Sequence, residues 1–204
     1  KNEGNIGDYA SGIVGLNCSD FKVSNCKNTG DLGDYSSGIV GYYSCFFTVE
    51  NCENTGLVSG QYSGGIVGER CSNFKVNDCV NKGNISDYSG GICGRQTGFN
   101  DDNNSTYDKY VELKNCINEG DIVGNNAGGI CGPSLGYNGS FSRYNPQTLK
   151  IKLNNCTNKG NITHEDTSAG ILGPSVLDNE YKNNTSRTIV ELENCYTKYG
   201  SLIG

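Results

Sequence analysis

Short segments of alternating apolar and polar residues recur along this chain. In Phe21-Lys22-Val23 a polar residue separates two apolar ones, and the later copies begin at Phe47, Phe74, Val111, Ile151 and Val190. The third residue of each copy is again apolar, and the residue between is Lys, Thr or Glu. A period of two is typical of a β-strand that buries one face. The pattern therefore predicts a series of equivalent β-strands.

Two further apolar positions recur in phase with these segments. The tetrapeptide Gly-Ile-(Val/Cys/Leu)-Gly begins at Gly12, Gly38, Gly65, Gly91, Gly129 and Gly170. A single aliphatic residue follows each turn glycine, at Ile6, Leu32, Val58, Ile85, Ile122, Ile162 and Leu202. The first tetrapeptides start 26 or 27 residues apart, and the later ones 38 and 41 apart. Each repeat thus contains three short apolar segments.

Strands this short cannot bury their apolar faces alone, so they are expected to stack on the equivalent strands of the next repeat. We predict an all-β fold in which residues 1–204 form one parallel β-solenoid, or β-helix, with six to seven coils of about 26 residues. A right-handed coil is expected, because about 98% of parallel crossover connections are right-handed. Helices are disfavoured because Gly and Asn interrupt every candidate window.

The turns between strands carry their own repeated residues. Asn or Asp precedes each repeat cysteine, at Asn25, Asn51, Asp78, Asn115, Asn155 and Asn194, and Asn follows it at Asn28, Asn54, Asn81, Asn118 and Asn158. Amide side chains at equivalent positions are expected to form ladders along the stack. We expect positive φ at the turn glycines Gly30, Gly56, Gly83, Gly120 and Gly160.

The longer intervals locate three insertions on one edge of the predicted solenoid, at Arg95–Lys109, Pro133–Thr148 and Pro174–Arg187. Stacked insertions are a common place for binding in repeat proteins, although they can also be variable surface loops. Their candidate ligand-binding aromatic residues are Phe99, Tyr107, Tyr137, Phe141, Tyr144 and Tyr181. Their candidate glycosylation sites are Asn103, Asn104, Asn138, Asn183 and Asn184.

Four tyrosines share one position before the tetrapeptide: Tyr9, Tyr35, Tyr62 and Tyr88. The equal spacing predicts a column of aromatic rings on neighbouring coils. Such a column can be structural, since stacked aromatic rings stabilise a sheet. It can also be a sugar-binding platform, provided that the rings are exposed and coplanar.

Eleven cysteines allow two interpretations. One cysteine in each repeat lies at the turn, and these residues can form a column of buried thiols that pack as small apolar groups: Cys26, Cys52, Cys79, Cys116, Cys156 and Cys195. Alternatively, within-coil disulfides can join Cys18 to Cys26, Cys45 to Cys52 and Cys71 to Cys79. Zinc is disfavoured because Cys-x₂-Cys spacing is missing and His164 is the single histidine. We expect neither a metal nor a cofactor.

Residues 12–30, Gly-Ile-Val-Gly-Leu-Asn-Cys-Ser-Asp-Phe-Lys-Val-Ser-Asn-Cys-Lys-Asn-Thr-Gly, resemble the GLUG repeat, with Cys26 where that repeat usually has Ser. GLUG repeats occur in large bacterial surface proteins, including regions beside IgA-specific metallopeptidase domains. The resemblance implies a structural or adhesive scaffold outside the cell or on its surface, and it transfers no catalytic residue.

We therefore expect a non-catalytic extracellular scaffold, stalk or fibre module whose loops bind a glycan or a host surface. The alternative is a carbohydrate-binding or polysaccharide-degrading β-helix, whose chemistry would need paired carboxylates, or acidic and basic residues, on one exposed face. The residues available for that role are Glu69, Arg70, Arg95, Asp101 and Asp102.

The net charge of −6 disfavours nucleic acid as a partner. Membrane insertion is not expected, because no apolar run reaches the roughly 18 residues of a spanning helix. Both ends of the chain fall inside a repeat and carry no cap, so we expect flanking repeats or end-to-end self-association to cover them.

Overall fold

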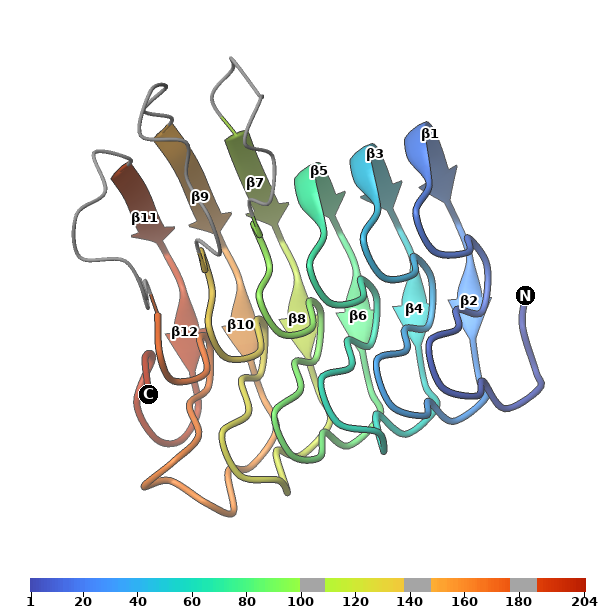
Figure 1. The fold of residues 1–204 in the computed structure, drawn as a ribbon. Helices are drawn as coiled ribbons and strands as arrows, with labels where there is room; N and C mark the ends of the chain where they lie inside the picture. The colour runs from blue at the N-terminus through green and yellow to red at the C-terminus, as the bar shows by residue number, and fades with distance from the viewer. Residues whose placement is uncertain (100–108, 138–147, 177–186) are drawn as a thin grey trace.

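The computed structural model describes residues 1–99, 109–137, 148–176 and 187–204. This part of the chain is all-β and contains no helix, and its strands form two parallel sheets of six strands each (Figure 1). The first sheet contains β1 (Ser19–Ser24), β3 (Cys45–Glu50), β5 (Ser72–Asn77), β7 (Lys109–Lys114), β9 (Thr148–Asn154) and β11 (Arg187–Glu193). The second contains β2 (Lys27–Asn28), β4 (Glu53–Asn54), β6 (Val80–Asn81), β8 (Ile117–Asn118), β10 (Thr157–Asn158) and β12 (Tyr196–Thr197). This arrangement is consistent with a β-helix or solenoid.

Strand pairing follows the repeats that the sequence pattern predicts. Phe21 lies opposite Phe47, which lies opposite Phe74, and the series continues through Val111 and Ile151 to Val190. The two other apolar positions form isolated parallel bridges, such as Leu32 with Val58 and Val40 with Val67. Each repeat therefore pairs with the next through its two strands and through these bridged positions.

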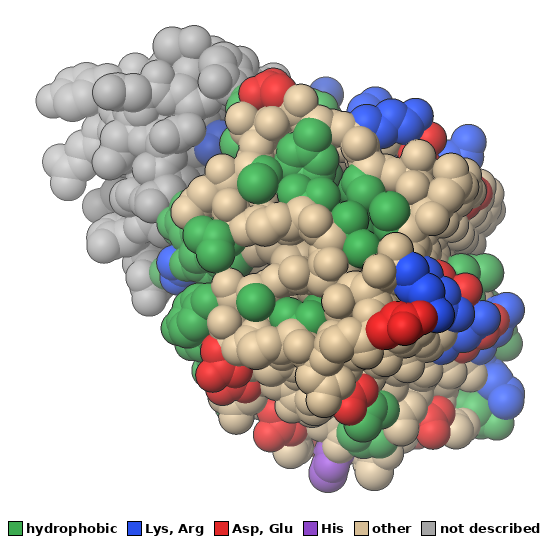
Figure 2. All heavy atoms as spheres, turned by 90° about the vertical axis from the view of Figure 1, so that its right-hand side faces the viewer, with side chains coloured by type: hydrophobic (Ala, Val, Ile, Leu, Met, Phe, Trp, Pro, Cys, Tyr) green, Lys and Arg blue, Asp and Glu red, His purple; other side chains and the backbone are tan. Residues whose placement is uncertain are grey.

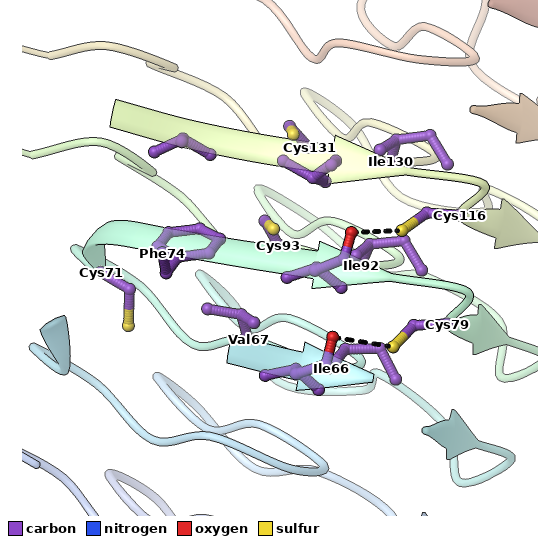
Figure 3. Packing of buried hydrophobic residues seen from close by; sticks show 14 of the residues in the cluster. Ile66, Val67, Cys71, Phe74, Cys79, Ile92, Cys93, Cys116, Ile130 and Cys131 are labelled. Carbon is purple, nitrogen blue, oxygen red and sulfur yellow. Dashed lines mark hydrogen bonds between the residues drawn. The ribbon is translucent and has the colours of Figure 1, made fainter. Parts of the chain in front are cut away.

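The core lies between these segments and combines aliphatic, aromatic and thiol groups (Figure 3). Phe74, Ile66 and Ile92 are fully buried. The rings of Phe21, Phe47 and Phe74 stack, with centroids 5.1 and 4.9 Å apart and interplanar angles of 6° and 1°. The alternation of buried and solvent-facing residues along β1 and its equivalents is thus confirmed.

A buried ladder of asparagine side chains, each from the second residue of a short strand, joins the coils at β2, β4, β6, β8 and β10. Nδ2 of each asparagine donates to Oδ1 of the next at 2.7–2.8 Å, through Asn28, Asn54, Asn81, Asn118 and Asn158. Nδ2 of each asparagine also donates to the carbonyl oxygen two residues further along the chain, as Nδ2 of Asn81 donates to Gly83 at 2.7 Å. At the last coil the hydroxyl of Thr197 takes the asparagine's place, 3.4 Å from Nδ2 of Asn158. The predicted ladder is confirmed at this column.

Two residues after each ladder asparagine stands a turn glycine, which is required by close packing and not by its φ angle. A Cβ added to Gly56 or Gly83 would overlap the carbonyl oxygen of the equivalent glycine in the preceding coil, and Gly30, Gly120 and Gly160 are equally crowded. Among the described glycines, positive φ occurs at Gly98, Gly136 and Gly200. The expectation of positive φ at the turn glycines is therefore wrong.

Non-glycine residues make the left-handed corners instead. One column is the residue before each repeat cysteine, with φ of 57° at Asn25, 51° at Asn51 and 54° at Asp78. Asn and Asp tolerate this conformation better than other side-chain-bearing residues. Two more corner columns flank the Gly-Ile-Val-Gly segment, and these border the candidate site described below.

Figure 2 shows the face that carries β1 and β2, where hydrophobic side chains gather at the centre between charged groups. Ile13, Val14 and Phe21 pack on the core from this coil and are only partly buried. Within the described ranges, no helix is long and apolar enough to cross a bilayer.

Candidate functional site

The first corner column beside the tetrapeptide consists of Tyr9, Tyr35, Tyr62 and Tyr88, followed in the next coil by Asn126. All five have left-handed backbone, with φ between 53° and 62°. This conformation is uncommon for tyrosine, and its repetition on successive coils shows that packing specifies it.

The four tyrosine rings lie against one another along the stack. The centroids of Tyr9 and Tyr35 are 4.6 Å apart with an interplanar angle of 5°, those of Tyr35 and Tyr62 are 4.9 Å apart, and those of Tyr62 and Tyr88 are 5.5 Å apart. Each inner ring therefore uses its faces on neighbouring rings rather than offering them to a ligand. The geometry favours the structural interpretation of the column, and a sugar-binding role for the whole column stays a prediction.

The second corner brings together charged and polar residues from neighbouring coils. Nε of Arg70 donates to Oε1 of Gln96 at 2.6 Å, and Nη1 donates to the hydroxyl of Tyr42 at 3.3 Å. The guanidinium of Arg70 also lies over the ring of Phe99, 4.8 Å from its centroid. Arg70 is thus held by one hydrogen bond on each side and by an aromatic face.

Glu69 lies beneath this corner with its side chain only 1% exposed. Its Oε1 is 3.5 Å from Nε of Arg70 and 3.8 Å from Nη1 of Arg95. Its Oε2 is buried and has no hydrogen-bond partner among the described residues. Burial raises the pKa of Glu69 to about 7, against the opposing effect of the two arginines. The carboxyl group therefore exchanges a proton near neutral pH.

Arg95 lies one coil further along and lines a small pocket of about 140 Å³. Its guanidinium carbon is 4.7 Å from the ring centroid of Tyr62. Tyr62 and Tyr88 form one wall, and the remaining lining residues are Asn126, Pro133, Ser134, Pro174 and Ser175. The pocket is therefore a mixed aromatic and polar cavity with one cationic group.

The structure thus brings together Glu69, Arg70 and Arg95, three of the five residues that the sequence offers for polysaccharide cleavage. It also stacks Phe99 on Tyr137, with centroids 6.0 Å apart and an interplanar angle of 6°. The other candidates in the insertions lie outside the described residues: Asp101, Asp102, Asn103, Asn104, Tyr107, Asn138, Phe141, Tyr144, Tyr181, Asn183 and Asn184.

Sequence analysis missed Tyr42, Gln96, Asn126, Ser134 and Ser175 as members of this site. A signal for them was present. Residues Leu16, Tyr42, Glu69, Arg95, Pro133 and Pro174 follow one another at the same intervals as the Gly-Ile-Val-Gly segments. This shared spacing indicates that the six residues occupy one corner of the stack.

The repeat cysteines form a column of thiols inside the stack. Cys52, Cys79, Cys116 and Cys156 are buried free thiols, whereas Cys26 and Cys195 are partly exposed. The backbone amides of Cys26 and Cys52 each donate to the sulfur of the next coil's cysteine at 3.4 Å. The hydrogen bond that the Cys79 thiol donates to the Cys52 sulfur, together with burial, raises the pKa of Cys79.

Another thiol, Cys71, is fully buried, and burial raises its pKa to about 12. The raised pKa values keep the Cys71 and Cys79 thiols protonated in the folded state, whereas the hydrogen bond with Cys79 lowers the pKa of Cys52 to about 7. The within-coil disulfides, Cys18 with Cys26, Cys45 with Cys52 and Cys71 with Cys79, stay a prediction. No group of three or more His, Cys, Asp or Glu residues in the described chain is arranged to hold a metal ion.

Comparison of the whole chain with family models, with curated proteins and with solved structures finds no match.

Proposed function

We propose that this chain is a non-catalytic structural module, a right-handed β-solenoid with coils of about 26 residues that serves as a scaffold or stalk in an extracellular or cell-surface protein. The asparagine ladder is the observation that carries this proposal. Five buried amides, each bonded to the next within 2.8 Å, use their hydrogen-bonding capacity along the axis of the stack.

Two other columns support the same function. Buried serine hydroxyls accept from the backbone of the preceding coil, as Ser63 does from Ser36 and Ser89 does from Ser63, both at 3.1 Å. On the exposed turns, Asp34 accepts from the amide of Gln61 at 2.8 Å. Interactions between equivalent residues of adjacent coils make a stack cohesive along its length, as a stalk requires. The GLUG-like segment at residues 12–30 is in keeping with this function.

The rival function is polysaccharide cleavage, which Glu69, Arg70 and Arg95 favour because they lie together. A glycosidase of the common type uses two carboxyl groups about 5–10 Å apart that both reach the substrate. Glu69 is 1% exposed, and its described charged neighbours are the two arginines. This cluster therefore supports binding or stability better than hydrolysis.

Pulling the chain by its two ends in a single-molecule force experiment tests the scaffold. A stack held coil to coil should lengthen in repeated steps of about 9 nm, since 26 extended residues span about 3.4 Å each. Rupture of the whole chain in one step would contradict a coil-by-coil stack. Incubation with acidic and neutral polysaccharides tests the rival, and new reducing ends or unsaturated products would support it.

End-to-end self-association is part of the proposal, and the apolar centre of the face in Figure 2 supports it. Sedimentation velocity should show elongated species whose size grows with concentration. A single monomeric species at high micromolar concentration would contradict it.

A further inference from the structure

The pocket beside Arg95 arises where two corner columns lose their large side chains. In the early coils the corners are filled by aromatic rings, and the ring of Tyr42 lies edge-on to Tyr9 at 6.3 Å. In the later coils the position of Tyr9 is taken by Asn126, and the position of Tyr42 by Pro133 and Pro174. The shorter side chains leave the cavity of about 140 Å³.

Arg95 has donors to spare in this cavity. A guanidinium carries five N–H groups in a fixed plane. Among the described residues, Arg95 has two side-chain partners, the ring of Tyr62 and Oε1 of Glu69. The ion-pair separation of 3.8 Å is too long for a hydrogen bond. The guanidinium therefore has unused N–H donors beside a pocket that it lines.

The remaining walls suit a sugar residue. Among the described residues that line the pocket, Arg95 is the only charged one, so the pocket favours an anion. Asn126, Ser134 and Ser175 supply an amide and two hydroxyl groups, which can bond to sugar hydroxyls in either direction. Tyr88 and the two prolines supply apolar surface for the C–H face of a ring. The cavity of about 140 Å³ is smaller than the roughly 300–1,000 Å³ of a typical ligand pocket, so it suits part of one sugar residue and not an oligosaccharide.

We propose that this pocket binds the carboxylate of a single uronic acid residue of an acidic polysaccharide, with Arg95 forming the paired hydrogen bonds to the carboxylate. Arginine matches a planar carboxylate with two parallel N–H groups, which makes this contact both strong and directional. Asn126, Ser134 and Ser175 then position the ring hydroxyls.

The buried carboxyl of Glu69 adds a pH dependence to this site. Arg70 and Arg95 act to lower the pKa of Glu69, and the charge of Glu69 in turn raises the pKa values of Tyr42, Tyr35 and Cys71. An anion bound to Arg95 opposes a negative charge on Glu69, so binding favours the protonated carboxyl. With its pKa at about 7, Glu69 should make uronate binding weaker as the pH rises from 6 to 8.

The test is a titration of the chain with glucuronate, galacturonate, glucose and acetate, followed by NMR chemical shifts. We expect millimolar binding of a uronate, no saturable binding of glucose, and acetate binding at least tenfold weaker than the uronate. Acetate binding equal to the uronate would overturn the assignment to a sugar, and equal binding of glucose would overturn the role of the carboxylate.

Arg95→Gln should weaken uronate binding at least tenfold, and Arg95→Lys should restore it only in part. Lys150→Gln, which removes the same charge from an exposed position on β9, is the matched control and should bind normally. If Arg95→Gln perturbs the far-UV circular dichroism, Ser134→Asn provides a second variant, because Asn keeps the left-handed corner and adds bulk to the pocket. Unchanged affinity in Ser134→Asn or in a folded Arg95→Gln protein refutes the site.

Discussion

Replacing Glu69 with Gln is expected to stabilise the fold at pH 8 and to leave it nearly unchanged at pH 4.5. The carboxyl is 1% exposed, its Oε2 has no partner among the described residues, and the nearest arginine nitrogens lie 3.5 and 3.8 Å from Oε1. Glutamine has nearly the same shape and carries no charge. The variant therefore keeps the packing and removes the cost of burying an ionised group.

The size of the effect follows from the pKa of Glu69, about 7 in the folded chain against an ordinary value of 4.5. Because one pKa unit corresponds to about 1.4 kcal/mol, ionised Glu69 costs the folded state about 3 kcal/mol. Below pH 4.5 the carboxyl is protonated in both states and the cost vanishes. As the pH rises from 4.5 to 7 the unfolded chain releases the proton first, so stability falls through that range and stays lower above it.

Urea denaturation followed by circular dichroism at pH 4.5 and pH 8 measures this difference. Glu69→Gln should raise the free energy of unfolding by about 3 kcal/mol at pH 8 and by less than about 0.5 kcal/mol at pH 4.5, with an unchanged m-value. Glu119→Gln is the matched control, since Glu119 is exposed in its pair with Lys159 and should contribute less than about 1 kcal/mol at either pH. A Glu69→Gln protein that is less stable than the parent at pH 8 would show that the arginines outweigh burial.

Three further substitutions test the packing between coils, each by urea denaturation. Asn81→Ala should cost about 3–5 kcal/mol because it leaves buried ladder partners unsatisfied, whereas Asn161→Ala, at an exposed turn, should cost less than about 1 kcal/mol; equal losses would refute the ladder's role. Gly83→Ala should be destabilising by more than about 2 kcal/mol, since its Cβ would overlap the Gly56 carbonyl, and a neutral result would mean that the coils can separate locally. Val49→Asp should cost several kcal/mol and Lys22→Glu about 0.5 kcal/mol or less, because Val49 is fully buried and Lys22 forms a surface pair with Glu50; similar values would reverse the assignment of faces.

The strand register was predictable because it depends on one local rule repeated many times. Phe21, Phe47 and Phe74 each stand in the same alternating segment, and an in-register parallel pairing is the arrangement that buries all three. The ladder at Asn28, Asn54 and their equivalents followed for the same reason. Identical side chains at identical positions in neighbouring coils must meet.

The turn glycines show what the repeat alone could not reveal. Gly56 and Gly83 are consistent either with positive φ or with a close approach of two backbones, and both demands exclude a Cβ. Only the distance between adjacent coils distinguishes them. The left-handed residues at the corners, such as Tyr35 and Arg70, were hidden for the opposite reason, because their side chains give no sign of an unusual φ angle.

The charged corner was partly predictable. Glu69, Arg70 and Arg95 are close in sequence, or one repeat apart, so their convergence follows from the register. The contacts that hold Arg70 do not follow, because they depend on Tyr42 and Phe99, which belong to a neighbouring coil and to the start of an insertion. An aromatic ring over this guanidinium is specific to this place in the stack and is not encoded by the repeat.

The contrast between ladders and pocket indicates where function is most readily found in such a stack. A column that keeps its residue through successive coils, as the asparagines do from Asn28 to Asn158, has each side chain bonded to its neighbours and leaves little for a ligand. A column that changes, from Tyr88 to Asn126 or from Arg95 to Pro133, interrupts that pairing and creates both space and unpaired donors. The departures from the repeat, rather than the repeat itself, are therefore the positions where a ligand can be recognised, and Arg95 lies at the largest of the departures described above.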